Sequence, residues 1–188
     1  MEKIIKASLL ALSIVASITL INAVAEYKFD RLIAKQDLTN PEVITVKQRE
    51  RQLECLAINI YREAGYEPFE GKVAVAQVTL NRARHPDFPH DVCAVVYQKN
   101  VMYSKVVCQF SWYCDNSHRT RPINREAYNE SYAVAKKVLL ENFRLDGLRD
   151  ALYYHADYVN PQWQLDRIGK IGQHIFYKPR KGNKNGEA

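Results

Sequence analysis

The stretch LECLAINIYREA, residues 53–64, decides the fold. Its apolar residues recur at intervals of three and four, which places them on one face of an amphipathic helix. These residues are Leu53, Leu56, Ala57, Ile60, Tyr61 and Ala64. The helical pattern begins near Thr45, and Gly65 is a typical signal for a helix end. The sequence therefore predicts a long helix with one buried face.

Glu63 lies near the end of this helix, seven residues after Leu56. Seven steps of about 100° bring both side chains nearly into register, so that Glu63 projects beside the apolar face. Burial and the negative end of the helix dipole both raise the pKa of such a carboxyl group. A protonated carboxylic acid is the general acid that glycosidic bond cleavage requires, which makes Glu63 a candidate catalytic residue. The alternative is that Glu63 only ends the helix, and spacing alone does not separate it from Glu67 and Glu70.

Three further helices are predicted downstream. Helical spacing covers residues 69–83, and Asp91 can cap a short helix over residues 92–98. Asn124 is the expected N-cap of the last helix. The inner face of that helix consists of Ala127, Ser131, Val134, Ala135 and Val138.

Three regions predict β-structure or ordered loops. Residues 101–116 are rich in β-branched and aromatic side chains, which favours a small hairpin or an ordered loop. Apolar residues alternate over residues 152–158, and residues 174–177 form a further candidate strand. The expected fold class is therefore α+β, mainly α, with a small β-hairpin region.

The first 25 residues have the pattern of an export signal. Lys3 and Lys6 precede an uncharged run that ends in Ala23-Val24-Ala25, an order typical of a secretory signal peptide. The uncharged run holds 19 residues, so a retained membrane anchor and a buried core helix are the alternatives. The expected organisation is a signal peptide or signal anchor at 1–25, a polar spacer at 26–48, a single domain at 49–178 and a basic flexible tail at 179–188.

The composition fits one globular domain of an exported protein. Of the 188 residues, 47% are hydrophobic and 26% charged, which excludes disordered and collagen-like classes. The net charge is +6, and it stays positive without residues 1–25, which hold two lysines and one glutamate. In an exported chain we expect this charge to meet acidic polymers of the cell envelope rather than nucleic acid.

Four cysteines, Cys55, Cys93, Cys108 and Cys114, would meet an oxidising compartment after export. Three pairings are open, and we favour Cys108–Cys114, which closes a short loop, together with Cys55–Cys93. The alternatives are a zinc site made by Cys108, Cys114 and His118, and four buried free thiols.

Aromatic side chains are frequent in the regions that are least helical by pattern. Aromatic rings in such regions often line ligand clefts, and the apolar faces of sugar rings can stack on them, although many aromatic residues belong to ordinary cores. His155 and His174 flank these regions, and each taken alone is expected to be a hydrogen-bonded structural histidine rather than a catalytic base or a metal ligand. The aromatic residues in question are Tyr97, Tyr103, Phe110, Trp112, Tyr113, Tyr153, Tyr154 and Trp163.

Six motifs follow one another along most of the chain after the export signal. They are CLAINIYREA at 55–64, GKVAVAQVTLNR at 71–82, VCAVVYQ at 92–98, CQFSWYCD at 108–115, ALYYHA at 151–156 with PQW at 161–163, and IGQHIFY at 171–177. In this order they resemble the motifs of the SleB/CwlJ-type cell wall hydrolases, a family that includes spore cortex-lytic enzymes.

The resemblance implies a lysozyme-like domain that acts on peptidoglycan. Members of the family cleave the β-1,4 bond between N-acetylmuramic acid and N-acetylglucosamine as lytic transglycosylases, with a single glutamate as acid and then base. This role falls on Glu63, and no cofactor or metal is implied. The expected substrate contacts are Gln109, Trp112, Tyr154, His155 and Trp163, and the cysteines are expected to be structural.

This chain departs from the family pattern directly after Glu63. Members usually continue Ala-Arg-Gly-Glu, whereas this chain has Ala64-Gly65-Tyr66-Glu67, and Asp150 stands where a glycine is common. The expectation is an exported monomer in the periplasm or outside the cell, with a membrane link only through its N-terminal segment. The alternative functions are a metal-dependent amidase or endopeptidase, an inactive peptidoglycan-binding module, and a phage endolysin with the same chemistry.

Overall fold

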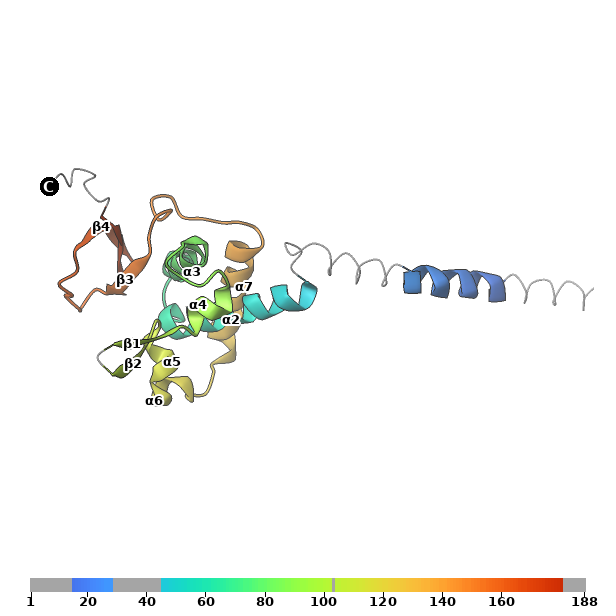
Figure 1. Ribbon diagram of the computed structural model, residues 1–188, viewed down its shortest axis with the longest axis horizontal. Helices are drawn as coiled ribbons and strands as arrows, with labels where there is room; N and C mark the ends of the chain where they lie inside the picture. Colours follow the sequence, from blue (N-terminus) through green and yellow to red (C-terminus); the bar gives the residue numbers. More distant parts are fainter. Residues whose placement is uncertain (1–14, 29–44, 103, 181–188) are drawn as a thin grey trace, which may run out of the picture. The chain divides into compact units, whose positions relative to one another are not determined.

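The computed structural model describes residues 15–28, 45–102 and 104–180 (Figure 1). The chain divides into two compact units, and the boundary lies between Gln48 and Arg49. In the first unit, residues 15–28 form a helix. Among the residues described, no helix is both long and apolar enough to cross a membrane. Much of the expected export signal, spacer and tail, at 1–14, 29–44 and 181–188, lies outside the described residues.

Four helices build the core of the second unit: α2 (Val46–Ala64), α3 (Phe69–Arg84), α4 (Val92–Val96) and α7 (Arg125–Leu139). All six apolar residues predicted for one face of α2 are buried, and so are the five predicted for the inner face of α7. Residues of all four helices meet in one hydrophobic cluster. α3 is buried almost all round because helices and sheet both pack against it.

The predicted helix caps are present in the structure. The Asp91 side chain accepts a hydrogen bond from the Ala94 backbone N–H, and the Asn124 side chain accepts one from Ala127. α4 ends at Val96, two residues before the predicted end. Satisfying the free N–H groups of the first turn in this way stabilises each helix by about 1 kcal/mol.

The predicted hairpin region holds a two-stranded antiparallel hairpin, β1 (Lys99–Met102) and β2 (Lys105–Cys108). Two short helices follow it, α5 (Ser111–Cys114) and α6 (Asn116–Arg119), where the sequence suggested hairpin or loop. Four residues are too few for helical periodicity to be read, which explains why the pattern did not indicate them.

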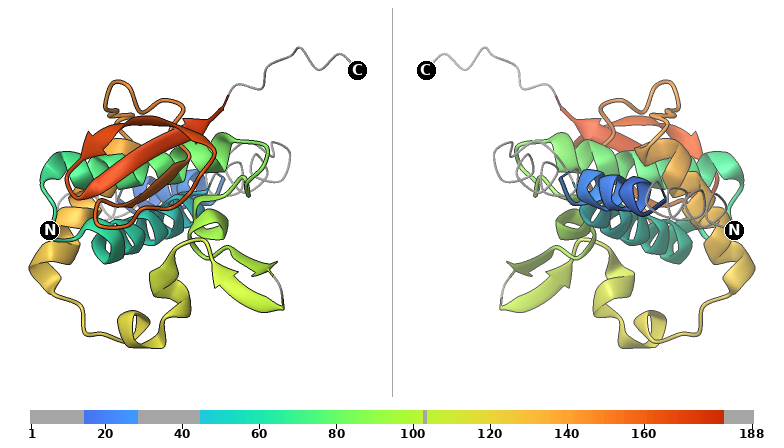
Figure 2. Two further views of the ribbon diagram at one scale, coloured as in Figure 1. Left: turned by 90° about the vertical axis from the view of Figure 1, so that its left-hand side faces the viewer. Right: turned by 90° about the vertical axis from the view of Figure 1, so that its right-hand side faces the viewer.

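A three-stranded antiparallel sheet lies alongside α3 (Figure 2). Its strands are β3 (Tyr153–Ala156), β4 (Leu165–Ile171) and β5 (His174–Pro179), with β5 in the centre. β4 was not predicted because charged residues and a glycine interrupt its alternation. Phe176 from β5 is fully buried in a second hydrophobic cluster. The other buried members of this cluster are Ala74, Val78, Leu148 and Ala151.

Two disulfides connect these elements, in the pairing favoured from the sequence. Cys55–Cys93 links α2 to α4, and Cys108–Cys114 links the end of β2 to α5. The zinc alternative is wrong in this structure, because Cys108 and Cys114 are bonded to each other and offer no thiolate to a metal. The fold is α+β and mainly helical, as predicted.

Candidate functional site

A cleft of about 350 Å³ opens at the C-terminal end of α2. Glu63 lies in the last turn of α2 and lines this cleft. The other lining residues come from the last turn of α2 and the turn after it, the segment from α6 onward, and the strands and turns of the sheet region: Tyr61, Arg62, Ala64, Gly65, Tyr66, Glu67, His118, Arg121, Pro122, Ala156, Tyr158, Gln173 and His174. Elements distant in sequence thus meet around the candidate acid.

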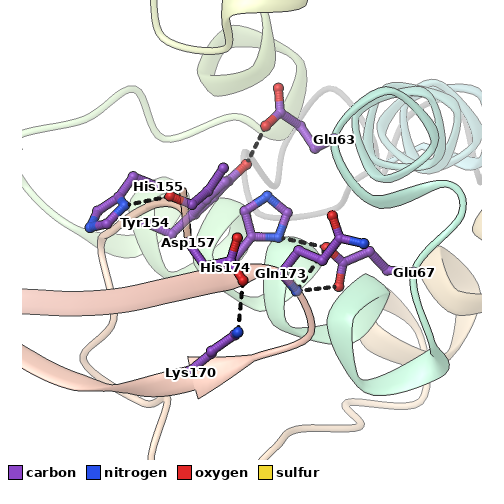
Figure 3. Close-up of polar contacts among 9 residues, drawn as sticks. Glu63, Glu67, Tyr154, His155, Asp157, Lys170, Gln173 and His174 are labelled. Carbon is purple, nitrogen blue, oxygen red and sulfur yellow. Dashed lines mark hydrogen bonds and ion pairs between the residues drawn. The ribbon is translucent and has the colours of Figure 1, made fainter. Parts of the chain in front are cut away.

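The surroundings of the Glu63 carboxyl group favour its protonated form. The Tyr154 hydroxyl donates a hydrogen bond to Glu63 Oε2 at 3.0 Å (Figure 3). Burial raises the pKa of Glu63, while the Tyr154 hydrogen bond and the positive charge of Arg82 act against that rise. The pKa remains raised because desolvation of the carboxylate is the largest effect.

Arg82 on α3 is a buried cation that the sequence motifs contained but the choice of site residues omitted. It is 3% exposed, and its Nε donates a hydrogen bond to the Leu152 carbonyl at 2.8 Å. Its guanidinium carbon lies 5.1 Å from the centre of the Phe110 ring and 5.9 Å from that of Tyr154. The structure therefore places a fixed positive charge close to Tyr154, with an electrostatic effect on Glu63.

Gln109, one of the expected substrate contacts, is bound to Arg82. With its amide turned so that both groups are satisfied, the Gln109 side-chain oxygen accepts hydrogen bonds from Arg82 Nη1 and Nη2, each at 3.2 Å. This arrangement gives Gln109 the role of holding the guanidinium.

Glu67 lines the same cleft but holds a turn of the sheet. Both of its carboxylate oxygens accept a hydrogen bond from the Gln173 backbone N–H, at 3.1 and 3.0 Å, and His174 Nδ1 lies 3.1 Å from Glu67 Oε1 (Figure 3). Gly172, with a φ of +56°, passes so close that an added Cβ would lie 1.6 Å from Glu67 Oε2. We call Glu67, Gly172, Gln173 and His174 the turn clasp.

Two other expected contacts, His155 and Trp163, do not line the cleft. Successive residues of a strand point to opposite faces, and on β3 Tyr154 turns toward Glu63 while His155 turns away from it (Figure 3). His155 stacks on Tyr177, with ring centres 5.3 Å apart, and Trp163 packs edge-on against both rings. Trp163 is 42% exposed, so this aromatic group forms a separate outer face of the sheet.

Trp112 belongs to the core rather than to the cleft. It is 4% exposed, and its indole N–H donates a hydrogen bond to Asn59 Oδ1 at 2.9 Å. Asn59 is itself fully buried and donates to Thr79 at 3.2 Å. This arrangement does not support the expected sugar contact of Trp112 and gives it a packing role between α5 and α2.

Comparison with known proteins identifies the family. A family model described as Cell Wall Hydrolase matches residues 66–177, more than half of the chain. The chain belongs to the cell wall hydrolase family. The matched range begins three residues after Glu63, so this cell wall hydrolase carries its candidate acid just outside the segment that defines the family match.

Curated relatives of this cell wall hydrolase include spore cortex-lytic enzymes. That of Bacillus subtilis (strain 168) is 30% identical over 128 residues, which are 66% of this chain and 36% of the relative. That of Bacillus cereus is 30% identical over 133 residues, which are 69% of this chain and 45% of the relative. The chain thus spans less than half the length of these relatives.

Two solved structures share the fold of this cell wall hydrolase. The catalytic domain of the Bacillus cereus SleB protein has a TM-score of 0.51 and 26% identity, and the match covers 69% of this chain and 91% of that domain. The catalytic domain of the germination-specific lytic transglycosylase SleB from Bacillus anthracis has a TM-score of 0.51 and 27% identity, with 74% and 100% covered. The fold is therefore the lysozyme-like one that the motifs implied.

The glycine that follows Ala64 in this cell wall hydrolase has a structural reason. The Gly65 backbone N–H closes α2 on the Tyr61 carbonyl at 3.1 Å, and a Cβ at Gly65 would lie 2.4 Å from that oxygen. Arg62, in the last turn of α2, donates hydrogen bonds to the carbonyls of Arg119 and Arg121, at 3.2 and 3.1 Å. The end of α2 is thereby tied to the opposite wall of the cleft.

Proposed function

We propose that this chain is an exported peptidoglycan lytic transglycosylase that cleaves the β-1,4 bond between N-acetylmuramic acid and N-acetylglucosamine. Membership of the cell wall hydrolase family supports a wall polymer as the substrate. A solved relative is named as a lytic transglycosylase. The observation that carries the proposal is Glu63, a half-buried residue that lines a cleft and whose carboxyl group has a raised pKa.

Glu63 acts first as the acid and then as the base. Its proton passes to the glycosidic oxygen as the bond from that oxygen to the muramic acid C1 breaks. The carboxylate then removes the proton from the muramic acid 6-hydroxyl, whose oxygen bonds to C1 and closes a 1,6-anhydro ring. No water is consumed, and Glu63 recovers its proton.

Tyr154 and Arg82 stabilise the carboxylate that exists between the two proton transfers. A hydrogen bond from a hydroxyl group and a nearby positive charge both favour the ionised form of a carboxyl group. Burial raises the pKa of Tyr154 well above its ordinary value, so its hydroxyl remains a donor throughout the working pH range. Desolvation thus favours the protonated form of Glu63, and these two neighbours stabilise the carboxylate that remains after the proton is transferred.

The other carboxyl groups near the cleft have partners of their own, which supports a single-acid mechanism. Hydrolytic glycosidases generally use two carboxyl groups. Glu67 accepts the hydrogen bonds of the turn clasp, and Asp157 forms an ion pair with Lys170 at 2.7 Å. Because both carboxylates already have these partners, neither is expected to act as a second catalytic group beside Glu63.

Mass spectrometry of digested peptidoglycan tests the reaction. Anhydro-muropeptides are the expected product, whereas muropeptides with reducing ends would indicate a hydrolytic muramidase and contradict the proposal. Free stem peptides would indicate the amidase alternative, and EDTA would abolish activity if that alternative required a metal. Full activity in EDTA is expected.

Two glutamate variants test the residue. Glu63→Gln keeps the size of the side chain but removes the acid, and it should lower the rate of product formation by about 10²- to 10⁴-fold. Glu70→Gln is the matched control, because Glu70 is exposed at the start of α3. If the chain is an inactive wall-binding module, both variants will give the same wall binding and the same product measurements as wild type.

Export is the second part of the proposal. Residues 1–25 would be removed as a signal peptide, leaving the spacer at 26–48 and the catalytic domain at 49–178. Intact-mass measurement of the protein from the envelope fraction is expected to show a chain that begins at Glu26. A chain that retains residues 1–25 would indicate the signal anchor, and recovery from the cytoplasm would contradict export.

A further inference from the structure

The second unit contains a larger hollow that the proposed reaction does not use. Its volume is about 630 Å³, and it lies between the C-terminal half of α3, the segment from α7 to β3, and the end of β5. It shares no lining residue with the Glu63 cleft. We call it the basic cavity, because Arg84, Arg144, Arg149 and Lys178 line it.

Amide side chains of α3 fix the wall of the basic cavity. Gln77, 1% exposed, accepts a hydrogen bond from the Leu145 backbone N–H at 2.8 Å and donates one to the Leu145 carbonyl at 3.3 Å. Asn81 donates to the carbonyls of Leu148 and Ala151, at 2.8 and 2.9 Å. Because these bonds hold the segment between α7 and β3 at both ends, the cavity is pre-formed, as ligand sites usually are.

The four basic side chains of the cavity have no carboxylate partner among the described residues. None of them takes part in a salt bridge. Arg84 and Arg144 line the same hollow, where burial and the positive charge of Arg84 lower the pKa of Arg144. Cations gathered in a hollow focus a positive potential there, and an anion that binds between them relieves their repulsion.

Two carboxylates limit the negative charge that the bound anion can carry. Asp146 and Asp150 also line the cavity, so four cations and two carboxylates leave an excess of two positive charges. A group with one or two negative charges matches this excess.

We propose that the basic cavity is a second binding site, which takes a single oxyanion, a phosphate or carboxylate group, between Arg84, Arg144 and Lys178. The planar guanidinium group matches both oxyanions through paired N–H donors. Phosphodiesters of wall polymers and carboxylates of wall peptides carry this chemistry. The choice between these sources rests on the proposed function, whereas the oxyanion site itself does not.

Calorimetric titration of the full chain with inorganic phosphate tests the site. The double variant Arg84→Gln/Lys178→Gln should bind phosphate at least about tenfold more weakly, since it removes two charge-assisted contacts. Neither side chain makes a hydrogen bond or ion pair with the rest of the described structure, so circular dichroism should show an unchanged fold. Arg144 is left in place because it donates to the Val138 and Phe143 carbonyls.

The matched control is Arg125→Gln. It removes the same charge from an exposed position at the start of α7, away from the cavity, and should leave phosphate affinity unchanged. Equal binding by wild type and the double variant would overturn the proposal, and so would equal weakening by the control. Glu63→Gln should bind phosphate normally, which separates this site from the proposed reaction.

The source of the oxyanion is identified with cell walls from which phosphate polymers have been stripped by hydrofluoric acid. If less wild type co-sediments with stripped walls than with intact walls, and the double variant shows no such decrease, the ligand is a phosphodiester. Co-sedimentation that persists on stripped walls and is competed by acetate identifies a carboxylate. Equal co-sedimentation of wild type and double variant with both preparations would overturn the assignment to a wall ligand.

Discussion

Glu63 and Glu67 line the same cleft four residues apart, yet the structure gives them opposite environments. Glu63 accepts one hydrogen bond, from Tyr154, and burial raises its pKa. Glu67 accepts the Gln173 backbone N–H on both oxygens and lies beside His174. Helical spacing alone does not distinguish the two residues. Their partners in the sheet do, because Tyr154 contacts the candidate acid Glu63, whereas Gln173 holds Glu67 in the turn clasp.

The largest expected effect is on activity, and it belongs to Glu63 alone. Glu63→Gln should lower the rate of product formation by about 10²- to 10⁴-fold, because a positioned general acid contributes that much. Glu67→Gln should lower the rate by less than about tenfold, since its amide oxygen can still accept the Gln173 N–H. Release of soluble muropeptides from purified walls measures both rates. Equal losses in the two variants would remove the distinction between acid and clasp.

The next effect is on stability, and it belongs to the clasp. Gly172→Ala should lower the free energy of unfolding by about 2 kcal/mol or more, because the methyl group displaces the Glu67 carboxylate and a positive φ strains alanine. Gly147→Ala is the matched control. Gly147 has a φ of +82° but open space around its added Cβ, so only about 1 kcal/mol of backbone strain is expected. Urea denaturation measures both, and equal costs would mean that the clasp contributes nothing.

The contrast between Glu63 and Glu67 also shows what the sequence could predict. The apolar faces of α2 and α7 and the caps at Asp91 and Asn124 depend on neighbours within a few residues, and these predictions were confirmed. The bond between Tyr154 and Glu63 joins residues 91 positions apart, so local spacing could not indicate it.

Among the expected substrate contacts, the outcome depends on which face of the sheet or core each residue occupies. Alternation along a strand predicts that Tyr154 and His155 point to opposite faces of the sheet. It could not predict which of the two faces Glu63, because the contact between β3 and the end of α2 was not known. Trp112 was an expected sugar contact from its motif and its place in a region without a helical pattern, but its hydrogen bond to buried Asn59 could not be predicted from the sequence. Arg82 was missed because a charged residue at the end of a helix usually faces solvent.

Tyr154→Phe tests how the sheet contributes to the environment of Glu63. The Tyr154 hydrogen bond favours the Glu63 carboxylate, so its loss should raise the pKa of Glu63 further and keep the acid protonated to higher pH. The alkaline limb of the pH–rate profile should move to higher pH, with a loss of rate of about tenfold or less. Tyr153→Phe, one residue away on the other face of β3, should leave the limb in place. A limb that moves to lower pH, or moves equally in both variants, would contradict this role of Tyr154.

The smallest expected effect is a gain of stability when the acid is removed. Burial raises the pKa of Glu63 in the folded state, so between the unfolded and folded pKa values the folded chain holds more protons than the unfolded chain. Stability therefore falls as pH rises through that window, and the cost of the buried charge is fully present above the folded pKa.

Glu63→Gln lacks this titration and should have a higher Tm than wild type at neutral pH. The difference should shrink as the pH falls toward the ordinary pKa of glutamate, where wild-type Glu63 is protonated in both states. Differential scanning calorimetry at a series of pH values measures it. Glu67→Gln should show no such gain, because the substitution leaves only one oxygen to accept the hydrogen bond that both Glu67 oxygens accept from the Gln173 backbone N–H. A Glu63→Gln variant that is less stable than wild type at neutral pH would mean that the Glu63 carboxyl group supports the fold rather than straining it.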